Sequence, residues 1–455
     1  MTITLALLLL YSALQVGLGV WIGRRVRTGG DFFVAGRGLP AGLIFAAFLA
    51  ANIGAGSTVG ATGVGYSDGL SAWWRNGSAG IGSLLLAFWI GPLIWREAKA
   101  HGDLTVGDFL ERHYSRSMRG VVAALIWFGT LSILAGQLMG IAAVLQVAGG
   151  VPPHYGFFAG ALVAVSYFAA GGLLSSSWVN RVQLLFILVG FAIVTPVVLN
   201  LAGGVDAVTS MPNPGFLGGG DVTGWRNIFI LVPAFIVSPG LLQRSFAGRD
   251  ASAVRRGIAL NGGVLLVFAF VPALLGMAAK LLFPELETRD LALPTLMSET
   301  LPPAVGALAL AAVFSAEIST ADAVLFMLAT SMSRDLYAGF INRSATDGQM
   351  VRVARFAAVA GACAGIALAF VFTSVVAALD AFYALLTVTM FVPVIGALHT
   401  QTRGRDGLMA VAFGLPVLAT VYLLTDGRGY SVVTPALAGI LASAAGFAAS
   451  RILPR

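Results

Sequence analysis

The sequence predicts an all-α polytopic membrane protein with about thirteen transmembrane helices. Of its 455 residues, 58% are hydrophobic and only 10% are charged, whereas soluble domains carry about 25% charged residues, so a water-soluble fold is excluded. The apolar residues are gathered into runs of about 20 residues, the length that crosses the hydrocarbon of a bilayer. Most of the basic residues fall in alternate loops between these runs, as the positive-inside rule expects.

The first apolar run, 2–22, is predicted to be a retained helix and not a signal peptide. It has no positively charged start, and its basic cluster, Arg24, Arg25 and Arg27, follows the apolar run. This order places the N-terminus outside. The further predicted spans are, in chain order, 40–66, 71–95, 118–148, 154–171, 178–202, 226–243, 254–283, 303–333, 353–373, 375–399, 408–424 and 433–450.

The loop charges fix the predicted orientation. With the N-terminus outside, 22 of the 27 Lys and Arg residues fall in cytoplasmic loops and at a cytoplasmic C-terminus. The net charge of +7 is then a topology signal and a contact with anionic lipid, so it needs no nucleic acid partner. We expect a multi-pass protein of a bacterial-type plasma membrane.

Two of the predicted spans are not ordinary helices. The second has Gly and small polar residues between Asn52 and Gly60, and the seventh contains Ser238, Pro239 and Gly240. Lipid cannot satisfy the backbone groups that such breaks release. Gly and Pro also kink ordinary transmembrane helices, but a matched pair of breaks five spans apart indicates a transporter built from inverted repeats, with its site at the breaks.

The sequence contains few side chains that could form a metal site or an enzyme active site. Cys363 is the only cysteine, which excludes an internal disulfide and a multi-cysteine metal site. The four histidines lie scattered near the ends of spans, and no nucleophile and base are paired. The sequence therefore predicts a protein that is not an enzyme and carries no cofactor.

An ordered set of short motifs covers nearly the whole chain. They are 31–37, 50–66, 105–110, 171–173 with Trp178, Gln243 with Arg244, 319–322 and 333–337. Each is weak alone, but together they resemble the solute:sodium symporter family, which includes the sodium/proline, sodium/galactose and sodium/sialic acid transporters. The resemblance implies sodium-coupled import of a small organic solute by alternating access, with sodium as the coupling ion and a monomer as the functional unit.

The same resemblance implies the domain organisation. A leading helix and cytoplasmic loop would occupy 1–38. A leucine-transporter-like core would follow, with five helices in 39–203 and five in 204–400. Two trailing helices would occupy 401–455.

The ninth span carries the predicted ion site. Ala316, Ser319 and Thr320 are spaced i, i+3 and i+4, so they share one helix face, and hard cations take carbonyl and hydroxyl oxygens. The resemblance implies that sodium binds the carbonyls of Ala50, Ile53 and Ala316 and the hydroxyls of Ser319 and Thr320. The alternative is that the two hydroxyls only bond back along their own helix.

Departures from the family matter for coupling. Some members carry an Asp for a second sodium ion where this chain has Asn180, next to Arg181, so we expect one sodium ion. Asp322 is predicted to be structural and paired. Glu317, which the family does not lead us to expect, is either a neutral acid in a helix contact or a proton site.

The solute is expected beside the ion. The candidate residues are Asn52, Ser57, Arg75, Asn76, Gln137, Tyr383 and Thr387. Gln137 could instead tie helices together, Tyr383 could serve packing, and Arg75 could be an interface anchor behind two tryptophans. Because no dense sugar-binding set of polar residues is present, we favour an amino acid or small carboxylate over a hexose.

Two alternatives remain open at this point. One is a proton-coupled carrier on the same fold that uses Glu317 or Asp380. The other is a transport-inactive sensor or a channel. A sensor would be expected to carry an output domain beyond the last span, and a channel needs a continuous polar path, which isolated acids do not provide.

Overall fold

The computed structural model describes residues 3–23, 37–211, 215–216, 223–430 and 432–452, without the side chains of 167, 169–175 and 177. Within this part of the chain the structure is helical and contains no β-strand, only two isolated bridges. Among the described residues, eleven helical stretches are long and apolar enough to cross a membrane. The predicted all-α polytopic class is therefore confirmed.

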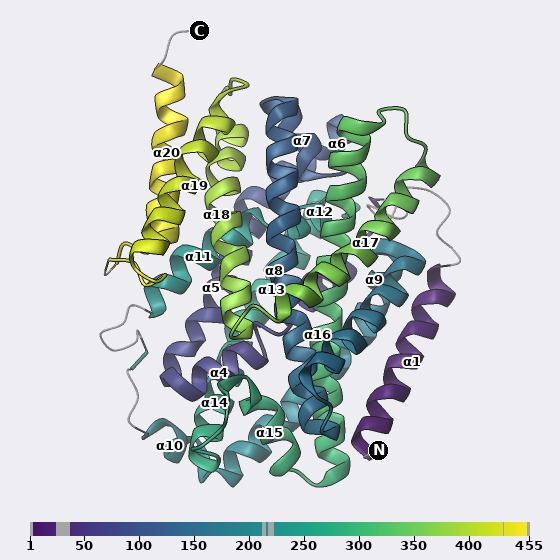
Figure 1. Ribbon diagram of the computed structural model, residues 1–455, viewed down its shortest axis with the longest axis vertical. Helices are drawn as coiled ribbons and strands as arrows, with labels where there is room; N and C mark the ends of the chain where they lie inside the picture. The colour runs from purple at the N-terminus through teal and green to yellow at the C-terminus, as the bar shows by residue number, and fades with distance from the viewer. Residues whose placement is uncertain (1–2, 24–36, 212–214, 217–222, 431, 453–455) are drawn as a thin grey trace.

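The helices alternate between the two edges of an elongated bundle (Figure 1). The first group is α1 (Ile3–Gly23), α3 (Ala41–Asn52), α4 (Val59–Asp68), η2 (Gly69–Ala72), α5 (Trp73–Leu85), η3 (Leu86–Ile90), α6 (Gly91–His101), α7 (Val106–His113), α8 (Arg116–Gly149), α9 (Pro153–Leu201) and α10 (Gly204–Thr209). The second group is α11 (Thr223–Val237), α12 (Pro239–Phe246), α13 (Ala251–Phe268), α14 (Phe270–Leu282), η4 (Arg289–Leu291), α15 (Ala292–Glu299), α16 (Pro303–Thr330), η5 (Ser331–Ile341), α17 (Asp347–Ala369), α18 (Val375–His399), α19 (Asp406–Leu424) and α20 (Pro435–Ile452).

Both predicted breaks are present. In the second crossing α3 ends at Asn52 and α4 begins at Val59, so 53–58 continue without a helix. In the seventh crossing α11 and α12 are separated by Ser238, and Pro239 opens α12, a position where the missing N–H of proline costs no hydrogen bond. Gly and Pro thus interrupt the helices where the sequence predicted.

The eleven stretches, the shorter apolar helix Ala41–Asn52 and the first part of α9 together account for the thirteen predicted crossings. One stretch, Val59–His101, joins the end of the second crossing to the third. The predicted spans 154–171 and 178–202 both lie in α9, apart from Ala202, which follows its last residue. This helix has 49 residues and would be about 73 Å long if straight. Gly149, just before α9, packs against Leu5 near the start of α1, and α9 leads into α10 at the same lower edge of Figure 1. We conclude that α9 contains two crossings.

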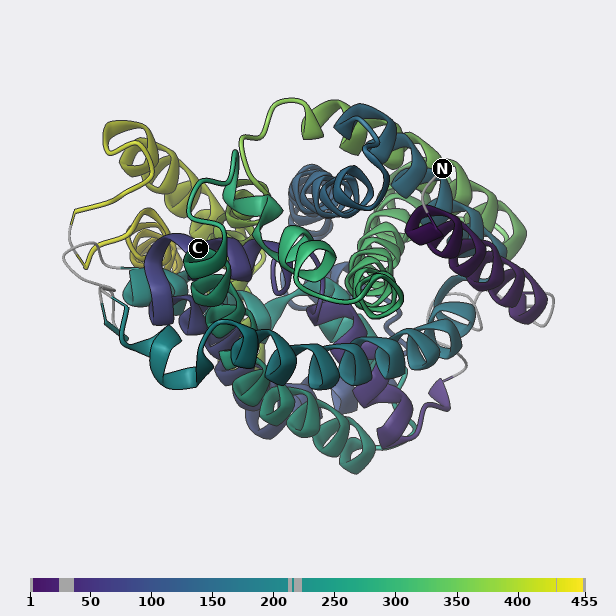
Figure 2. The same cartoon turned by 90° about the horizontal axis from the view of Figure 1, so that it is seen from below.

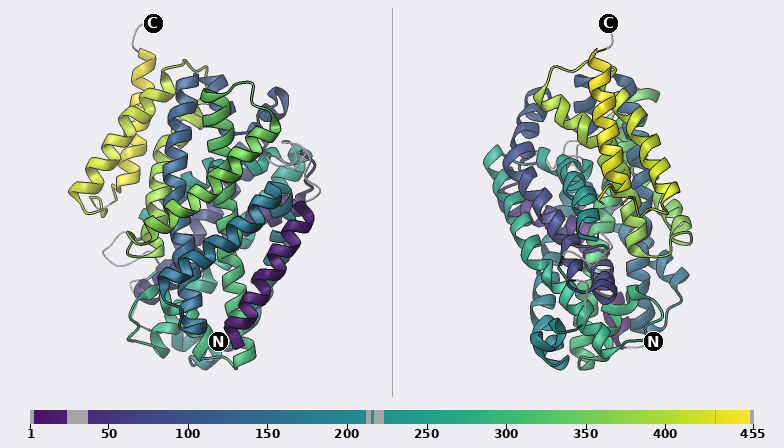
Figure 3. Two further views of the ribbon diagram at one scale, coloured as in Figure 1. Left: turned by 45° about the vertical axis from the view of Figure 1, so that its right-hand side comes forward. Right: turned by 90° about the vertical axis from the view of Figure 1, so that its left-hand side faces the viewer.

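The first and last helices lie on the outside of the bundle. Figure 2 places α1 and the α19–α20 pair at opposite sides, and Figure 3 shows that α1 begins at the edge away from the end of α20. Between them α16 packs against α3, α8 and α9. The two broken crossings reach this buried centre, since α12 contacts both α3 and α16.

Two of the motifs meet at the edge where α20 ends. Thr105 Oγ1 donates to Asp335 Oδ1 at 2.5 Å. Arg119 then pairs with Asp335 at 3.1 Å, with Asp108 at 2.9 Å and with Glu111 at 2.7 Å. This charged cluster joins α7, the start of α8 and η5. Of the motif 31–37 only Arg37 is described, and the side chains of 171–173 also lie outside the described residues.

Candidate functional site

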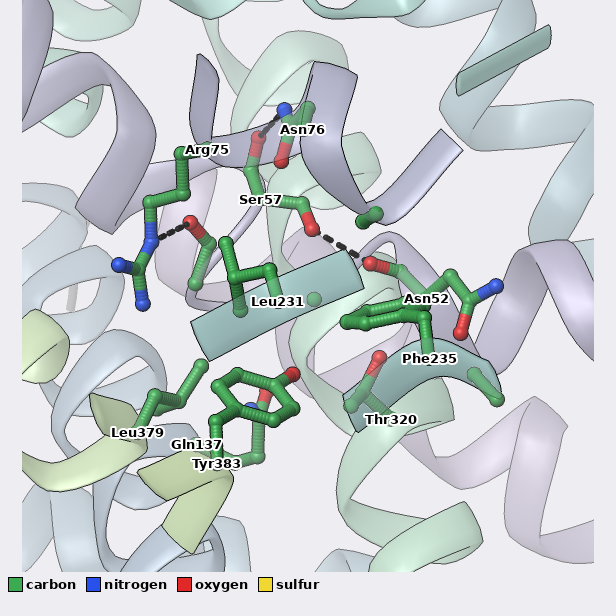
Figure 4. Close-up of a pocket in the computed structure, with 14 residues that line it drawn as sticks. Asn52, Ser57, Arg75, Asn76, Gln137, Leu231, Phe235, Thr320, Leu379 and Tyr383 are labelled. Carbon is green, nitrogen blue, oxygen red and sulfur yellow. Dashed lines mark hydrogen bonds between the residues drawn. The ribbon is translucent and has the colours of Figure 1, made fainter. Parts of the chain in front are cut away.

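Side chains from other helices hold the first break together. They bond to backbone groups that have left the helical ladder, which lipid could not satisfy. Gln137 Oε1 accepts from Ala55 N at 2.9 Å, Arg75 Nε donates to Gly56 O at 3.1 Å, Asn76 Nδ2 donates to Ser57 O at 2.9 Å, and Ser57 Oγ donates to Asn52 O at 2.5 Å. Figure 4 draws the last three of these hydrogen bonds as dashed lines beside the cavity. Several predicted solute residues therefore also stabilise the broken helix.

The predicted sodium ligands converge between α3 and α16. Ser319 Oγ and Thr320 Oγ1 both donate to Ala50 O, at 2.9 and 3.1 Å. Ser319 Oγ also lies 2.9 Å from Ala316 O. The Thr320 bond runs across to α3, and the single hydrogen of Ser319 can reach a carbonyl on either helix, so bonding back along α16 alone does not describe this contact.

The fifth predicted ligand is the carbonyl of Ile53, next to the glycine that approaches α16. Ile53 is fully buried at the first residue of the break. A Cβ added to its neighbour Gly54 would collide with Thr320 Oγ1, so the break backbone touches the hydroxyl of α16. Only glycine permits this close approach. Carbonyls and hydroxyls without a carboxylate form a cluster suited to a hard monovalent cation.

A small cavity of about 20 Å³ adjoins the predicted ion site (Figure 4). Six of the seven predicted solute residues line it, namely Asn52, Ser57, Arg75, Asn76, Gln137 and Tyr383. Thr387 does not, because its buried hydroxyl donates to Ile230 O at 2.9 Å and ties α18 to α11. Sequence reasoning missed the apolar wall of Leu231, Phe235 and Leu379, which has no signal beyond the hydrophobicity common to every span.

Arg75 is a buried residue and not an interface anchor. Its side chain is 5% exposed, and Nη1 pairs with Asp380 at 2.9 Å. Asp380 also faces Arg226 at 3.5 Å, so this group of three carries one net positive charge. The alternative in which Arg75 reaches the outer surface is wrong for this conformation.

Two hydrogen-bond donors in the cavity lack partners. Within the described residues Arg75 Nη2 and Gln137 Nε2 are buried and bond to no protein atom. An unpaired buried donor is costly, so a ligand that supplies acceptor oxygens would relieve both. A carboxylate, which only accepts hydrogen bonds, fits these two donors better than a hydroxyl group, whose own hydrogen would also need an acceptor.

A second small cavity, of about 40 Å³, continues from the first towards α12. The two share Asn52, Phe235, Thr320 and Tyr383. Arg244 of α12 lines the second cavity and is 2% exposed, with Nη1 donating to Gly240 O at 3.1 Å and with no recorded partner for Nε or Nη2. From the sequence, Arg244 was recognised only as part of a motif and was not predicted to line a cavity. Its position just after the Pro-Gly break could have indicated this.

The three intramembrane acids differ in their surroundings. Asp380 has arginine partners, as described above. Asp322 is fully buried near Arg244 but forms no salt bridge among the described side chains. The structure therefore does not show the ion pair that was predicted for Asp322. Glu317 faces Thr58 of the first break. Asn180 is buried, whereas Arg181 is exposed beside Trp178.

Known proteins resemble this chain in sequence and in fold. A family model described as the sodium:solute symporter family matches residues 32–412. The sodium/glucose cotransporter of Vibrio parahaemolyticus is 25% identical over 77% of this chain and 71% of its own length. The sodium/pantothenate symporter of Escherichia coli strain K12 is 27% identical over 72% of this chain and 71% of its own length. A solved structure of a Na+-coupled sialic acid symporter, in a substrate-bound outward-open state, superposes with a TM-score of 0.82 at 17% identity, over 99% of this chain and 97% of the other.

Proposed function

Because this chain belongs to the sodium:solute symporter family and carries out sodium-coupled symport of small solutes, we propose that it imports a small organic carboxylate together with one sodium ion. Amino acids and small organic acids are the favoured solutes. The sodium ion is the coupling ion, no other cofactor takes part, and the monomer is the functional unit. The names of the relatives include both glucose and pantothenate, so the solute class is argued from this chain's own cavity.

One observation carries the sodium site. The hydroxyls of Ser319 and Thr320 meet the carbonyl of Ala50 across two helices. When sodium binds, the two hydroxyl hydrogens turn away and all the oxygens direct lone pairs at the ion. Sodium then bridges α3 and α16, and it favours whichever conformation holds these helices together. The domain division of the sequence, with repeats in 39–203 and 204–400, remains part of the proposal.

The solute class rests on the positive charge around the two cavities. Arg75 lines the first cavity and Arg244 the second, each with unpaired N–H groups. A carboxylate that binds Arg75 and Gln137 next to sodium would then meet a second guanidinium on its way to the other edge. Charge-assisted bonds of this kind contribute about 1.5–3 kcal/mol each.

The orientation is proposed from the loop charges. With the start of α1 outside, the edge that contains the end of α20 is cytoplasmic and holds most of the basic residues. Import then runs from the cavity lined by Arg75 towards the cavity lined by Arg244. The membrane is a bacterial-type plasma membrane.

Uptake by proteoliposomes tests this proposal. A panel of radiolabelled carboxylates, neutral amino acids and sugars is offered with an imposed sodium gradient. We expect a carboxylate-bearing solute to accumulate, with a sodium Hill coefficient near one, because Asn180 provides no charge for a second ion. Accumulation of a sugar alone would contradict the solute class, and a Hill coefficient near two would contradict the stoichiometry.

A further inference from the structure

An apolar groove runs along the outside of the bundle, with α9 on one side and α13 and α14 on the other. Its volume is about 930 Å³, within the range of about 300–1,000 Å³ that ligand sites occupy. The groove shares no lining residue with the two small cavities of the solute site. It is therefore a separate candidate site.

The lining of this groove is apolar and partly exposed. Apart from Thr195 and Arg256, every lining residue is apolar. Phe191 of α9 and Phe268 of α13 are buried and meet edge to face at 5.3 Å, so they join the two walls. Val267 is 73% exposed. In a bundle of transmembrane helices an exposed apolar surface of this kind faces the acyl chains of lipid.

Arg256 lies at one end of the groove. It is exposed and forms no salt bridge among the described side chains, whereas the nearby Asp250 is paired with Arg249. The stretch Ala251–Leu282 has 32 residues, or about 48 Å of helix, so it extends beyond the hydrocarbon of about 30 Å at both ends. Arg256, in the second turn of this stretch, is then close to the level of the lipid headgroups.

The length of the groove matches one leaflet of a bilayer. From Arg256 to Val271 the lining covers about 22 Å of helix, and half of a bilayer, headgroups included, is about 20–22 Å thick. Gly263 lies between these two residues and faces open space, because a Cβ added there would meet nothing within 4 Å. The groove thus has room for an acyl chain whose headgroup lies at a cation.

We propose that this groove binds one anionic phospholipid of the cytoplasmic leaflet, with the phosphate at Arg256 and an acyl chain along α13. A guanidinium forms charge-assisted hydrogen bonds with phosphate, and anionic lipids give the cytoplasmic leaflet its negative surface potential. The start of α13 lies at the proposed cytoplasmic edge, since Trp95 of α6 donates to Gly248 O, just before α13, at 2.8 Å. The lipid site is independent of the proposed sodium and solute sites.

Both walls of the groove pack against α3. Gly257, next to Arg256, lies so close to α3 that a Cβ added there would be 2.8 Å from Ala41 O. The other wall, α9, also packs against α3. A lipid that bridges α9 and α13 therefore supports two neighbours of the helix that carries Ala50, and we expect it to stabilise the folded protein.

Thermal unfolding of the purified, delipidated protein in an uncharged detergent tests the lipid site. Dioleoyl phosphatidylglycerol should raise the Tm to a plateau, because a ligand that binds only the folded state stabilises it. Dioleoyl phosphatidylcholine should need a concentration about tenfold or more higher, since its headgroup is neutral overall. Arg256→Gln should remove this preference for phosphatidylglycerol. Arg255→Gln, which removes an adjacent exposed charge outside the groove lining, should keep it.

A variant that fills the groove separates binding there from general contact with charged lipid. Gly263→Leu should abolish the rise in Tm without destabilising the lipid-free protein, because leucine has space there and favours a helix over glycine. Its matched control is Gly17→Leu in α1, where a Cβ also meets nothing within 4 Å, and this variant should respond to lipid like the wild type.

Several outcomes would overturn the lipid site. Equal responses of the wild type to the two lipids would do so, as would a wild-type response to phosphatidylglycerol in Arg256→Gln or in Gly263→Leu. Glycerol 3-phosphate, which has the phosphate but no acyl chains, should leave the Tm unchanged. An equal rise in Tm with glycerol 3-phosphate would show a site for a free anion in place of a lipid.

Discussion

Ser319 and Thr320 illustrate what a residue pattern can and cannot predict. Their spacing from Ala316 and the motif around them predicted a shared face and a role in ion binding, and the structure brings both hydroxyls to Ala50. The partners of the break could not be predicted in the same way. Gln137 reaches Ala55 across 82 positions and Glu317 reaches Thr58 across 259, and such pairings depend on how the helices pack.

Arg75 gives the sharpest test of solute class. Arg75→Gln should raise the apparent KM for the solute about tenfold or more, because a charge-assisted bond is lost. The same change leaves Asp380 without its 2.9 Å partner, so stability should fall as well. Adding Asp380→Asn should restore stability while the KM stays high.

Uptake kinetics and thermal unfolding separate these two effects. Arg226→Gln is the matched control, since Arg226 is 39% exposed in its side chain and lies 3.5 Å from the same carboxylate. It should leave the KM near that of the wild type. A wild-type KM in Arg75→Gln with Asp380→Asn would remove the reason to prefer carboxylates, and a neutral solute would then be equally acceptable.

At the scale of elements, the breaks were predictable because Gly and Pro mark them directly. The continuity of α9 could not be predicted. Two apolar runs separated by a few small and polar residues look the same in a sequence whether or not a loop lies between them. The charged cluster at the cytoplasmic edge shows a further limit. Its motifs were recognised separately, but their meeting through Arg119 depends on the packing of α7, α8 and η5.

The charged cluster should contribute strongly to stability. Arg119→Ala leaves Asp108 and Asp335 close together without their shared cation, and breaking such a buried pair costs on the order of 3–5 kcal/mol. We expect a clear fall in Tm for the protein in detergent. Arg249→Ala, which removes an exposed pair with Asp250, should leave the Tm nearly unchanged. Equal Tm values for wild type and Arg119→Ala would contradict a stabilising role.

At the scale of the whole molecule, hydropathy and loop charge were sufficient for the class of fold because the bilayer restricts the choices. The predicted number of crossings follows from the run lengths. An odd number places the two ends of the chain on opposite sides of the membrane, and Figure 3 shows them at opposite edges of the bundle. The cavities could not be predicted, since they lie where several discontinuous segments meet.

The orientation can be tested with single cysteines. Cys363 is the only native cysteine, so Cys363→Ser gives a background for Arg428→Cys between α19 and α20 and Gln401→Cys between α18 and α19. Both positions are exposed. In intact cells a membrane-impermeant maleimide should label position 428, while position 401 should react only after permeabilisation. The reverse pattern would invert the proposed topology.

The central claim is that one sodium ion binds where the first break meets α16. Radioactive sodium binding to the purified protein tests it most directly. Ser319→Ala with Thr320→Ala removes two of the five proposed ligands and should weaken sodium binding by at least about tenfold. The matched control is Thr330→Ala with Ser333→Ala, a pair whose hydroxyls bond back to Phe326 and Ala329, and it should bind sodium like the wild type. Wild-type sodium affinity in Ser319→Ala with Thr320→Ala would contradict the account.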